Sequence, residues 1–147
     1  MKLSIDSQAP DFSASNQDGV VKKLSDFKGT WLVLYFYPKD FTPGCTVEAQ
    51  TFRDAYDALK QQAVIVGVST DSVESHKKFC THYTLPFMLL ADPQKTLMNA
   101  YGTDGILFAK RTTFLIDPDG VIKKIYEKVD PQIHAQEIEK DLRTFRS

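Results

Sequence analysis

The chain has 147 residues, of which 42% are hydrophobic and 25% charged, an ordinary composition for a globular protein that forms one core. Its 18 Lys and Arg residues against 19 Asp and Glu give a net charge of −1, which argues against nucleic acid or an anionic membrane as a partner. No apolar run approaches the ~20 residues that span a bilayer, and the first seven residues lack the apolar core of a signal peptide. We therefore expect a single cytoplasmic domain over residues 1–147.

The first 30 residues predict a short hairpin followed by a tight loop or a turn of helix. Strand candidates near residues 11–14 and 19–24 flank Asn16-Gln17-Asp18-Gly19, which has the composition of a hairpin turn. Residues 25–29 form the loop or helical turn. The apolar run 31–37 that follows predicts a buried central strand.

A helix is expected after this strand, and its first turn holds Cys45. Thr42 suits the N-cap and Pro43 the first helical position, where its missing N–H costs nothing. The free N–H groups and the helix dipole at such a terminus stabilise a thiolate, the reactive form of cysteine. The alternative is that Cys45 is a buried cysteine with no chemical role. The order Thr, Pro, Gly, Cys favours a reactive cysteine. The apolar side of the helix is Phe52, Ala55, Tyr56 and Leu59.

The middle of the chain continues the alternation of strands and helices. The apolar run 63–70 is typical of a parallel strand covered on both faces, and 87–90 predicts another buried strand. Between them, Asp71 and Glu74 form a capping pattern that opens a helix. One face of that helix carries Val73, Phe79, Cys80 and Tyr83. Asp92-Pro93 begins a short helix that Gly102 ends, with an apolar side of Leu97, Met98 and Tyr101.

The last third predicts two antiparallel strands and a closing helix. Strands at 112–116 and 121–126 flank the turn Asp117-Pro118-Asp119-Gly120, which lacks the ligand spacing of a calcium loop. A helix should begin near Pro131, with Ile133, Ile138, Leu142 and Phe145 as core contacts. This order of elements predicts an open α/β sheet with mixed strand directions.

The two cysteines and three histidines do not make a disulfide scaffold or a four-ligand zinc site. His76 and Cys80 share a helix face, but two ligands alone are weak evidence for a metal. We expect no metal and no cofactor. In a reducing compartment, a pair of cysteines is then inert or part of a redox cycle.

Pro38, Thr42 and Cys45 match the Pro-x-x-x-Thr-x-x-Cys signature of the peroxiredoxins, with Glu48 at the usual acidic position. Residues 35–54 resemble the peroxiredoxin Q branch, also called bacterioferritin comigratory protein, and the resemblance covers nearly the whole chain. It implies a thioredoxin-like fold: a mixed central sheet flanked by helices, with an N-terminal β-hairpin extension and an insertion before the last hairpin.

The resemblance also implies a thiol-dependent peroxidase that reduces hydrogen peroxide and organic hydroperoxides. Cys45 would be the nucleophile, and Pro38 would shield it from water. Thr42 would offer its hydroxyl to the peroxide. The N–H groups of Gly44 and Cys45 would stabilise negative charge on the peroxide oxygens.

Arg111 matches the family's active-site arginine and should lie at the start of a strand beside the one that leads to Cys45. Lys110 and Arg53 are rival cations. Glu48 lies one helical turn beyond Cys45 and would orient the arginine rather than touch substrate.

Cys80 corresponds to a resolving cysteine that some members of the branch carry on the following helix. The alternative position, five residues after Cys45, is Gln50 here. The implied cycle runs through a sulfenic acid to an intramolecular disulfide, which thioredoxin or a similar dithiol protein reduces. A one-cysteine peroxidase and a non-enzymatic redox sensor stay open, whereas a disulfide reductase would need a Cys-x-x-Cys pair. Relatives of this branch are often monomers, and we expect a monomer here.

Overall fold

A five-stranded mixed sheet forms the centre of the computed structural model, which describes residues 3–105 and 108–146. Its strand order is β5-β4-β3-β6-β7. The first three strands are parallel to one another, and β6 and β7 run antiparallel to their neighbours. The strands are β3 (Trp31–Phe36), β4 (Ala63–Ser69), β5 (Met88–Ala91), β6 (Thr112–Ile116) and β7 (Ile122–Tyr126). The predicted mixed α/β sheet is confirmed.

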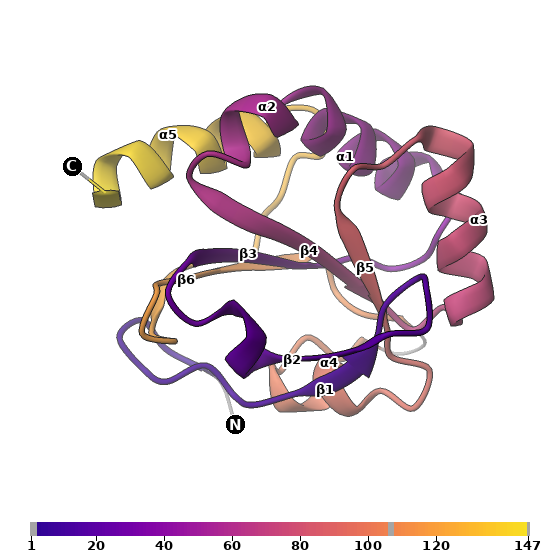
Figure 1. Cartoon of the computed structure of the whole chain (residues 1–147), viewed down its shortest axis with the longest axis horizontal. Coiled ribbons are helices and arrows are strands. Elements are labelled where there is room, and N and C mark those ends of the chain that lie inside the picture. Colours follow the sequence, from indigo (N-terminus) through magenta and orange to yellow (C-terminus); the bar gives the residue numbers. More distant parts are fainter. Residues whose placement is uncertain (1–2, 106–107, 147) are drawn as a thin grey trace.

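Helices cover both faces of the sheet (Figure 1). The face drawn uppermost carries α1 (Pro43–Asp54), α2 (Tyr56–Leu59), α3 (Val73–Tyr83) and α5 (His134–Arg146). The opposite face carries the predicted N-terminal hairpin and two short helical segments: β1 (Ser13–Ser15), β2 (Val21–Lys23), the 3-10 helix η1 (Leu24–Phe27) and α4 (Thr96–Ala100). Side chains of β3 alternate between the two layers. Val33 and Tyr35 join the core under α1, whereas Leu34 and Phe36 join the other one.

The pairing of β3 with β6 brings the Arg111 segment to the site. Phe36, the last residue of β3, lies opposite Thr112, the first residue of β6. Arg111 precedes Thr112 directly. It therefore lies beside the point where β3 ends and the loop that leads to Cys45 begins. This is the strand neighbourhood that the sequence predicts.

Several helix boundaries differ from the predictions, among them those of α1 and α3. The helix that holds Cys45 breaks at Ala55, whose N–H donates to the carbonyl of Thr51 while α2 begins at the next residue. The predicted Asp71 cap is wrong. Ser72 is the N-cap of α3 and accepts a hydrogen bond from the N–H of Ser75 at 3.1 Å. Asp71 instead accepts from backbone and side-chain donors outside the helix.

The last helix begins at His134, later than predicted, and its core residues are partly different. Ile133 precedes the helix and is 53% exposed, and Phe145 is 41% exposed, so both are wrong as core contacts. Ile138 and Leu142 are buried as predicted, together with Ala135. Phe145 packs at the rim of the core against Trp31, with ring centroids 5.7 Å apart.

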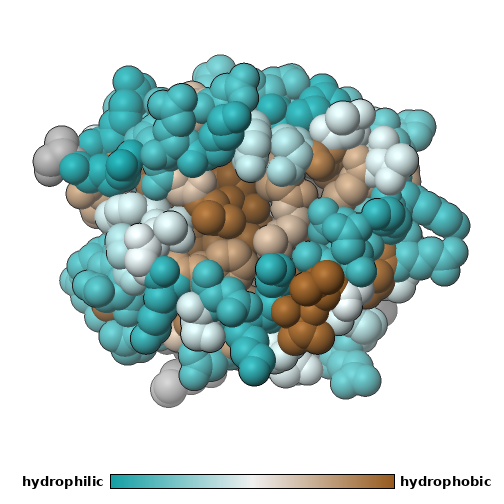
Figure 2. Space-filling model, in the orientation of Figure 1, coloured by the Kyte–Doolittle hydropathy of each residue, from teal (hydrophilic) through white to brown (hydrophobic). Residues whose placement is uncertain are grey.

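Polar side chains cover most of the face seen in Figure 2, and apolar ones gather in its middle, between the helices drawn at the top and the hairpin drawn at the bottom. None of the helices in the described part of the chain has the length and apolar character needed to cross a membrane.

Candidate active site

Cys45 lies in the first turn of α1, as the sequence predicts. Thr42 occupies the N-cap position with an extended backbone, Pro43 is the first helical residue, and the N–H of Thr46 makes the first helical bond, to the carbonyl of Thr42. The N–H groups of Gly44 and Cys45 precede that bond and have no partner within the helix by its geometry. The Cys45 side chain is buried, with 1% exposed. The thiol therefore sits among helix-terminal N–H donors in a site largely closed to water.

The guanidinium of Arg111 joins Cys45 to Glu48. Its Nη2 donates to Cys45 Sγ at 3.3 Å, and its Nη1 donates to Glu48 Oε1 at 2.5 Å. A Cβ added to Gly44 would lie 3.0 Å from the same Nη2. The glycine in the motif therefore leaves the space in which the arginine approaches the thiol. Burial lowers the pKa of Arg111, but the negative charges of Glu48 and Cys45 outweigh it and raise that pKa overall. The guanidinium therefore keeps its positive charge.

Glu48 is fully buried and orients the arginine as expected. Burial raises its pKa to about 7, and the charge and hydrogen bond of Arg111 act in the opposite direction. Its second oxygen, Oε2, has no hydrogen-bond partner among the described residues. The carboxyl group thus changes its charge in the neutral range while it holds Arg111 in place.

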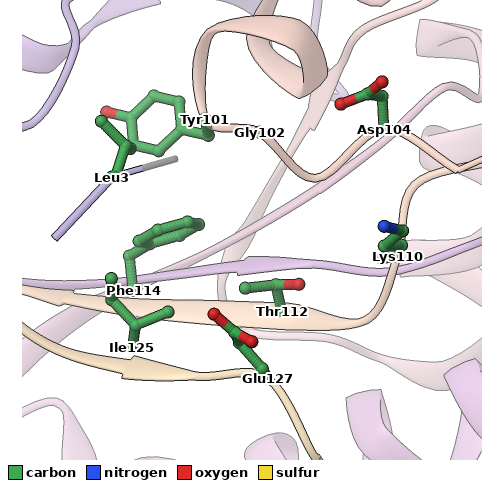
Figure 3. A pocket seen from close by; sticks show the side chains of 9 residues that line it. All are labelled: Leu3, Tyr101, Gly102, Asp104, Lys110, Thr112, Phe114, Ile125 and Glu127. Carbon is green, nitrogen blue, oxygen red and sulfur yellow. The ribbon is translucent and has the colours of Figure 1, made fainter. Parts of the chain in front are cut away.

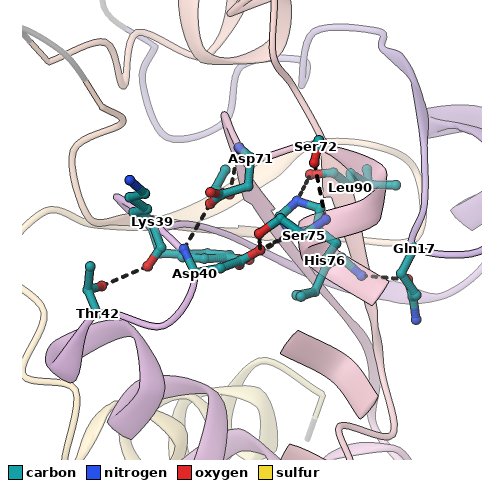
Figure 4. Close-up of polar contacts among 12 residues, drawn as sticks. Gln17, Lys39, Asp40, Thr42, Asp71, Ser72, Ser75, His76 and Leu90 are labelled. Atoms are coloured by element: carbon teal, nitrogen blue, oxygen red, sulfur yellow. Dashed lines mark hydrogen bonds and ion pairs between the residues drawn. The ribbon is translucent and has the colours of Figure 1, made fainter. Parts of the chain in front are cut away.

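Thr42 does not use its side chain as a helix cap. Its hydroxyl donates to the carbonyl of Lys39 at 2.7 Å, on the side of the loop that precedes the helix (Figure 4). The lone pairs of the oxygen are then left to accept a hydrogen bond, for example from the O–H of a peroxide. Pro38 stands half-buried at the start of the same loop.

The two rival cations are held elsewhere. Arg53 donates to the carbonyl of Tyr83 at 2.9 Å and to Asp54, so it ties α1 to the end of α3. Lys110 lines a cavity of about 400 Å³ that lies on the other face of the sheet (Figure 3). That cavity is also lined by Tyr101 and Phe114, which belong to the core away from Cys45. Arg111 is thus the cation at the thiol.

Cys80 lies on α3 in the same apolar core as Cys45, and both cysteines are free. Its side chain is buried, and burial, followed by the negative charges of Asp40 and Asp18, raises its pKa to about 12. In this fold Cys80 is therefore a protonated and unreactive thiol.

Sequence reasoning missed a buried polar cluster beside the Cys45 loop. Asp40 and His76 lie 2.7 Å apart, with 4% and 0% exposed. With Asp71 they place potential metal-ligating atoms within 4.8 Å of one another, but hydrogen bonds already occupy these atoms. We therefore interpret the cluster as a hydrogen-bonded network rather than a metal site. Two observations could have indicated it: Asp40 lies inside the Pro-x-x-x-Thr motif, and His76 lies one turn before Cys80 on the same helix face.

Comparison with known proteins agrees with this geometry. Residues 5–125 match the model of the AhpC/TSA family. The chain is 42% identical to peroxiredoxin Bcp of Bacillus subtilis over 93% of each protein, and 41% identical to chloroplastic peroxiredoxin Q of rice (Oryza sativa subsp. japonica) over 98% of this chain and 69% of the rice protein.

Solved structures give the same result. A peroxiredoxin Q mutant from Xylella fastidiosa superposes with a TM-score of 0.95 and 31% identity, over 100% of this chain and 99% of that one. The bacterioferritin comigratory protein of Xanthomonas campestris, described with an alkyl peroxide reduction activity, superposes with a TM-score of 0.88 and 32% sequence identity over 92% of each chain. The chain therefore belongs to the AhpC/TSA family, and within it to the peroxiredoxin Q branch of thiol-dependent peroxidases.

Proposed function

We propose that Cys45 is the peroxidatic cysteine and that Arg111, Thr42 and the first turn of α1 assemble the reaction around it. The observation that carries this proposal is the 3.3 Å contact between Arg111 Nη2 and Cys45 Sγ in a buried helix terminus. A guanidinium and helix-terminal N–H groups stabilise a thiolate there, and the thiolate is the nucleophile that peroxide reduction needs.

The thiolate attacks one peroxide oxygen, an S–O bond forms and the O–O bond breaks. Thr42 accepts a hydrogen bond from the O–H of the peroxide and so orients it. Arg111 and the N–H groups of Gly44 and Cys45 stabilise the charge that develops on the oxygens. The departing oxygen takes a proton and leaves as water or an alcohol, and Cys45 becomes a sulfenic acid. The half-buried Pro38 limits the access of water to the thiolate.

The substrates that we propose are hydrogen peroxide and organic hydroperoxides. The alkyl peroxide reduction ascribed to the Xanthomonas relative supports the second group. Side chains, backbone N–H groups and the peroxide itself carry every step of this reaction, so the proposal includes no metal or cofactor.

Cys80 is our candidate for the resolving cysteine. Its sulfur would attack Sγ of the Cys45 sulfenic acid, the S–O bond would break, and the hydroxyl would leave as water with the Cys80 proton. Thioredoxin or a similar dithiol protein would then reduce the disulfide by exchange. The common apolar core of the two cysteines supports this pairing.

One observation favours the second candidate, a peroxidase whose sulfenic acid is resolved by an outside thiol. Burial raises the pKa of Cys80 to about 12, so the folded helix α3 keeps Cys80 protonated. Resolution by Cys80 therefore requires α3 to move.

A monomeric state and a cytoplasmic location stay predictions, which sedimentation and cell fractionation check.

A coupled assay with thioredoxin, thioredoxin reductase and NADPH tests the proposal. Wild type should turn over, and Cys45→Ser should be inactive. Cys80→Ser should consume about one equivalent of peroxide and then stall with thioredoxin, yet continue with dithiothreitol. Sustained thioredoxin turnover by Cys80→Ser would establish the one-cysteine cycle instead. A wild-type protein that is oxidised once and never recycled would be a sensor.

A further inference from the structure

The loop that leads to Cys45 is bound to α3 through one buried carboxylate. Asp40 Oδ2 accepts from Ser75 Oγ at 2.8 Å and lies 2.7 Å from His76 Nδ1, and both partners belong to α3 (Figure 4). Its other oxygen, Oδ1, accepts from the hydroxyl of Tyr37 at 2.6 Å. Asp40 thus joins three parts of the chain: the end of β3, the loop that leads to Cys45, and helix α3.

The two ring nitrogens of His76 have different partners. Nε2 lies 3.0 Å from the carbonyl oxygen of Leu90, which only accepts, so this nitrogen carries a proton. Nδ1 lies 2.7 Å from Asp40 Oδ2, and a hydrogen bond between them needs one proton, on the ring or on the carboxyl group. Asp40 also accepts from Tyr37 and Ser75. Asp40 and His76 therefore form a buried hydrogen-bonded pair at the centre of a small network.

The same aspartate is held from a second side. Its backbone N–H donates to Asp71 Oδ2 at 2.8 Å, and that oxygen also accepts from Ser69 Oγ at 2.6 Å. Ser69 ends β4, so the sheet fixes the backbone of Asp40. His76 and Ser75 are therefore the movable partners, because they belong to a helix that must leave for resolution.

Phe41 adds an aromatic contact between the same two segments. It adopts a left-handed backbone conformation with φ of 64°, which is strained for a bulky residue. Its ring lies 5.0 Å from that of Phe79 and 6.1 Å from that of Tyr83, both on α3. When α3 leaves, this support of the strained loop is lost together with the contact between Asp40 and His76.

We propose that Asp40 and His76 are positioning residues for the resolving step: their buried hydrogen-bonded contact sets how readily α3 leaves the Cys45 loop, and so how long the sulfenic acid waits for Cys80. This inference rests on the proposed role of Cys80. The folded α3 keeps the Cys80 thiol buried and protonated, so its release is needed both to bring the sulfurs together and to allow the thiol to ionise. A weaker pair therefore speeds disulfide formation and leaves the attack of Cys45 on peroxide unchanged.

A rapid-mixing experiment separates these two steps. Reduced enzyme is mixed with one equivalent of hydrogen peroxide, quenched in acid, alkylated and analysed by mass spectrometry for sulfenic acid and disulfide. The test variants are His76→Gln, which removes the imidazole ring, and Ser75→Ala, which removes one hydroxyl donor. Lys78→Gln is the matched control, because Lys78 lies on the solvent side of α3 and pairs with the exposed Glu74.

We expect His76→Gln to form the disulfide about tenfold faster and Ser75→Ala a few-fold faster, with the peroxide step changed by less than about twofold in both. Lys78→Gln should match wild type in both steps. At high peroxide, His76→Gln should also accumulate less Cys45 sulfinic acid, since its sulfenic acid waits for a shorter time.

Wild-type rates of disulfide formation in both variants would overturn the proposal, as would a lower melting temperature with an unchanged ratio of the two rates. If His76→Gln does not fold, Ser75→Ala and Tyr37→Phe decide the question, because each removes a single hydroxyl from Asp40. Wild type that forms no Cys45–Cys80 disulfide would instead refute the proposed role of Cys80. Disulfide formation that is insensitive to Ser75 and Tyr37 refutes only the positioning role of Asp40 and His76.

Discussion

Arg111 Nη2 lies 3.3 Å from Cys45 Sγ, although the two residues are 66 positions apart in the sequence. The antiparallel register of β3 and β6 brings them together, because Phe36 pairs with Thr112 and each strand end carries one of the two functional segments. The contact therefore depends on the sheet, and the helix terminus only completes it.

Arg111→Ala should slow peroxide reduction by at least about tenfold, or ~1.4 kcal/mol of lost transition-state stabilisation. The guanidinium is the cation that contacts the sulfur, so its loss should also slow the alkylation of Cys45 by iodoacetamide at neutral pH. Stopped-flow kinetics with hydrogen peroxide measures the first effect. Lys110→Ala is the matched control, because Lys110 is the neighbouring cation and lines the cavity on the other face. Wild-type kinetics in Arg111→Ala would remove the arginine from the reaction.

Gly44→Ala should lower the rate of peroxide reduction and raise the stability of the protein. An added Cβ would lie 3.0 Å from Arg111 Nη2, so the guanidinium must shift away from the thiol, and we expect a few-fold slower peroxide reduction. Gly44 has an ordinary helical position and no positive φ, so alanine should stabilise the helix by up to about 1 kcal/mol. Thermal unfolding and peroxide kinetics on the same preparation check both effects, with Gln50→Ala as a control on the same helix. An alanine variant as fast as wild type would show that Arg111 tolerates the shift.

The sequence predicted the elements whose patterns are local, and it failed where a partner comes from another element. The strands and the position of Cys45 follow from apolar runs and from the Thr-Pro-Gly-Cys order. Asp71 carried the pattern of a helix cap, but the backbone of Asp40 and the hydroxyl of Ser69 compete for its carboxylate, and Ser72 caps the helix instead.

The pairing of Asp40 with His76 could not be predicted from the sequence for the same reason. A histidine on a helix face does not reveal that a loop 36 positions earlier in the sequence will supply its carboxylate. Ile133 was misplaced because the last helix begins one residue later, at His134, whose ring turns inward and bonds Thr113 on β6 at 2.7 Å. Arg111 was found only through the family resemblance, since an arginine at a strand end is usually solvated.

Glu48 should make the stability of the protein depend on pH in a defined window. Burial raises its pKa from the ordinary 4.5 to about 7, so the folded state holds the proton more tightly than the unfolded chain. The stability that this group contributes is complete below pH 4.5 and is lost as the pH rises through about 7. Glu48→Gln should remove this loss, which we expect to reach about 3 kcal/mol at most.

Urea unfolding of wild type and Glu48→Gln between pH 4.5 and 8 measures this effect, and Glu74→Gln, at an exposed position on α3, is the control. The difference in the free energy of unfolding between wild type and Glu48→Gln should change with pH in that window. The same difference for Glu74→Gln should stay nearly constant. A pH-independent difference for Glu48→Gln would show that Arg111 keeps the carboxylate ionised throughout.

Formation of the Cys45–Cys80 disulfide should unfold part of α3. Cys45 is fixed in the first turn of α1, which also buries Glu48, Ala49 and Phe52, whereas α3 buries His76, Phe79 and Cys80 at the edge of the sheet beside β5. A disulfide needs Cα atoms within about 7 Å and suitably directed Cβ atoms, and helices pack no closer than ~8–10 Å between axes. The hydrogen-bond contacts of Ser75 and His76 with Asp40 also hold α3. We still expect α3 to unfold before α1, because it buries fewer residues.

Hydrogen exchange followed by mass spectrometry on reduced and oxidised enzyme tests this order. On oxidation, exchange should rise sharply over Val73–Tyr83 and less over residues 42–50, while Trp31–Phe36 and Ala63–Ser69 stay protected, because these central strands are paired on both sides. Cys80→Ser treated with one equivalent of peroxide is the control, since it reaches the sulfenic acid without the disulfide and should keep α3 protected. Unchanged exchange in both helical segments of the oxidised wild type would mean that the two cysteines pair without leaving the fold. A rise confined to residues 42–50 would mean that α1, rather than α3, gives way.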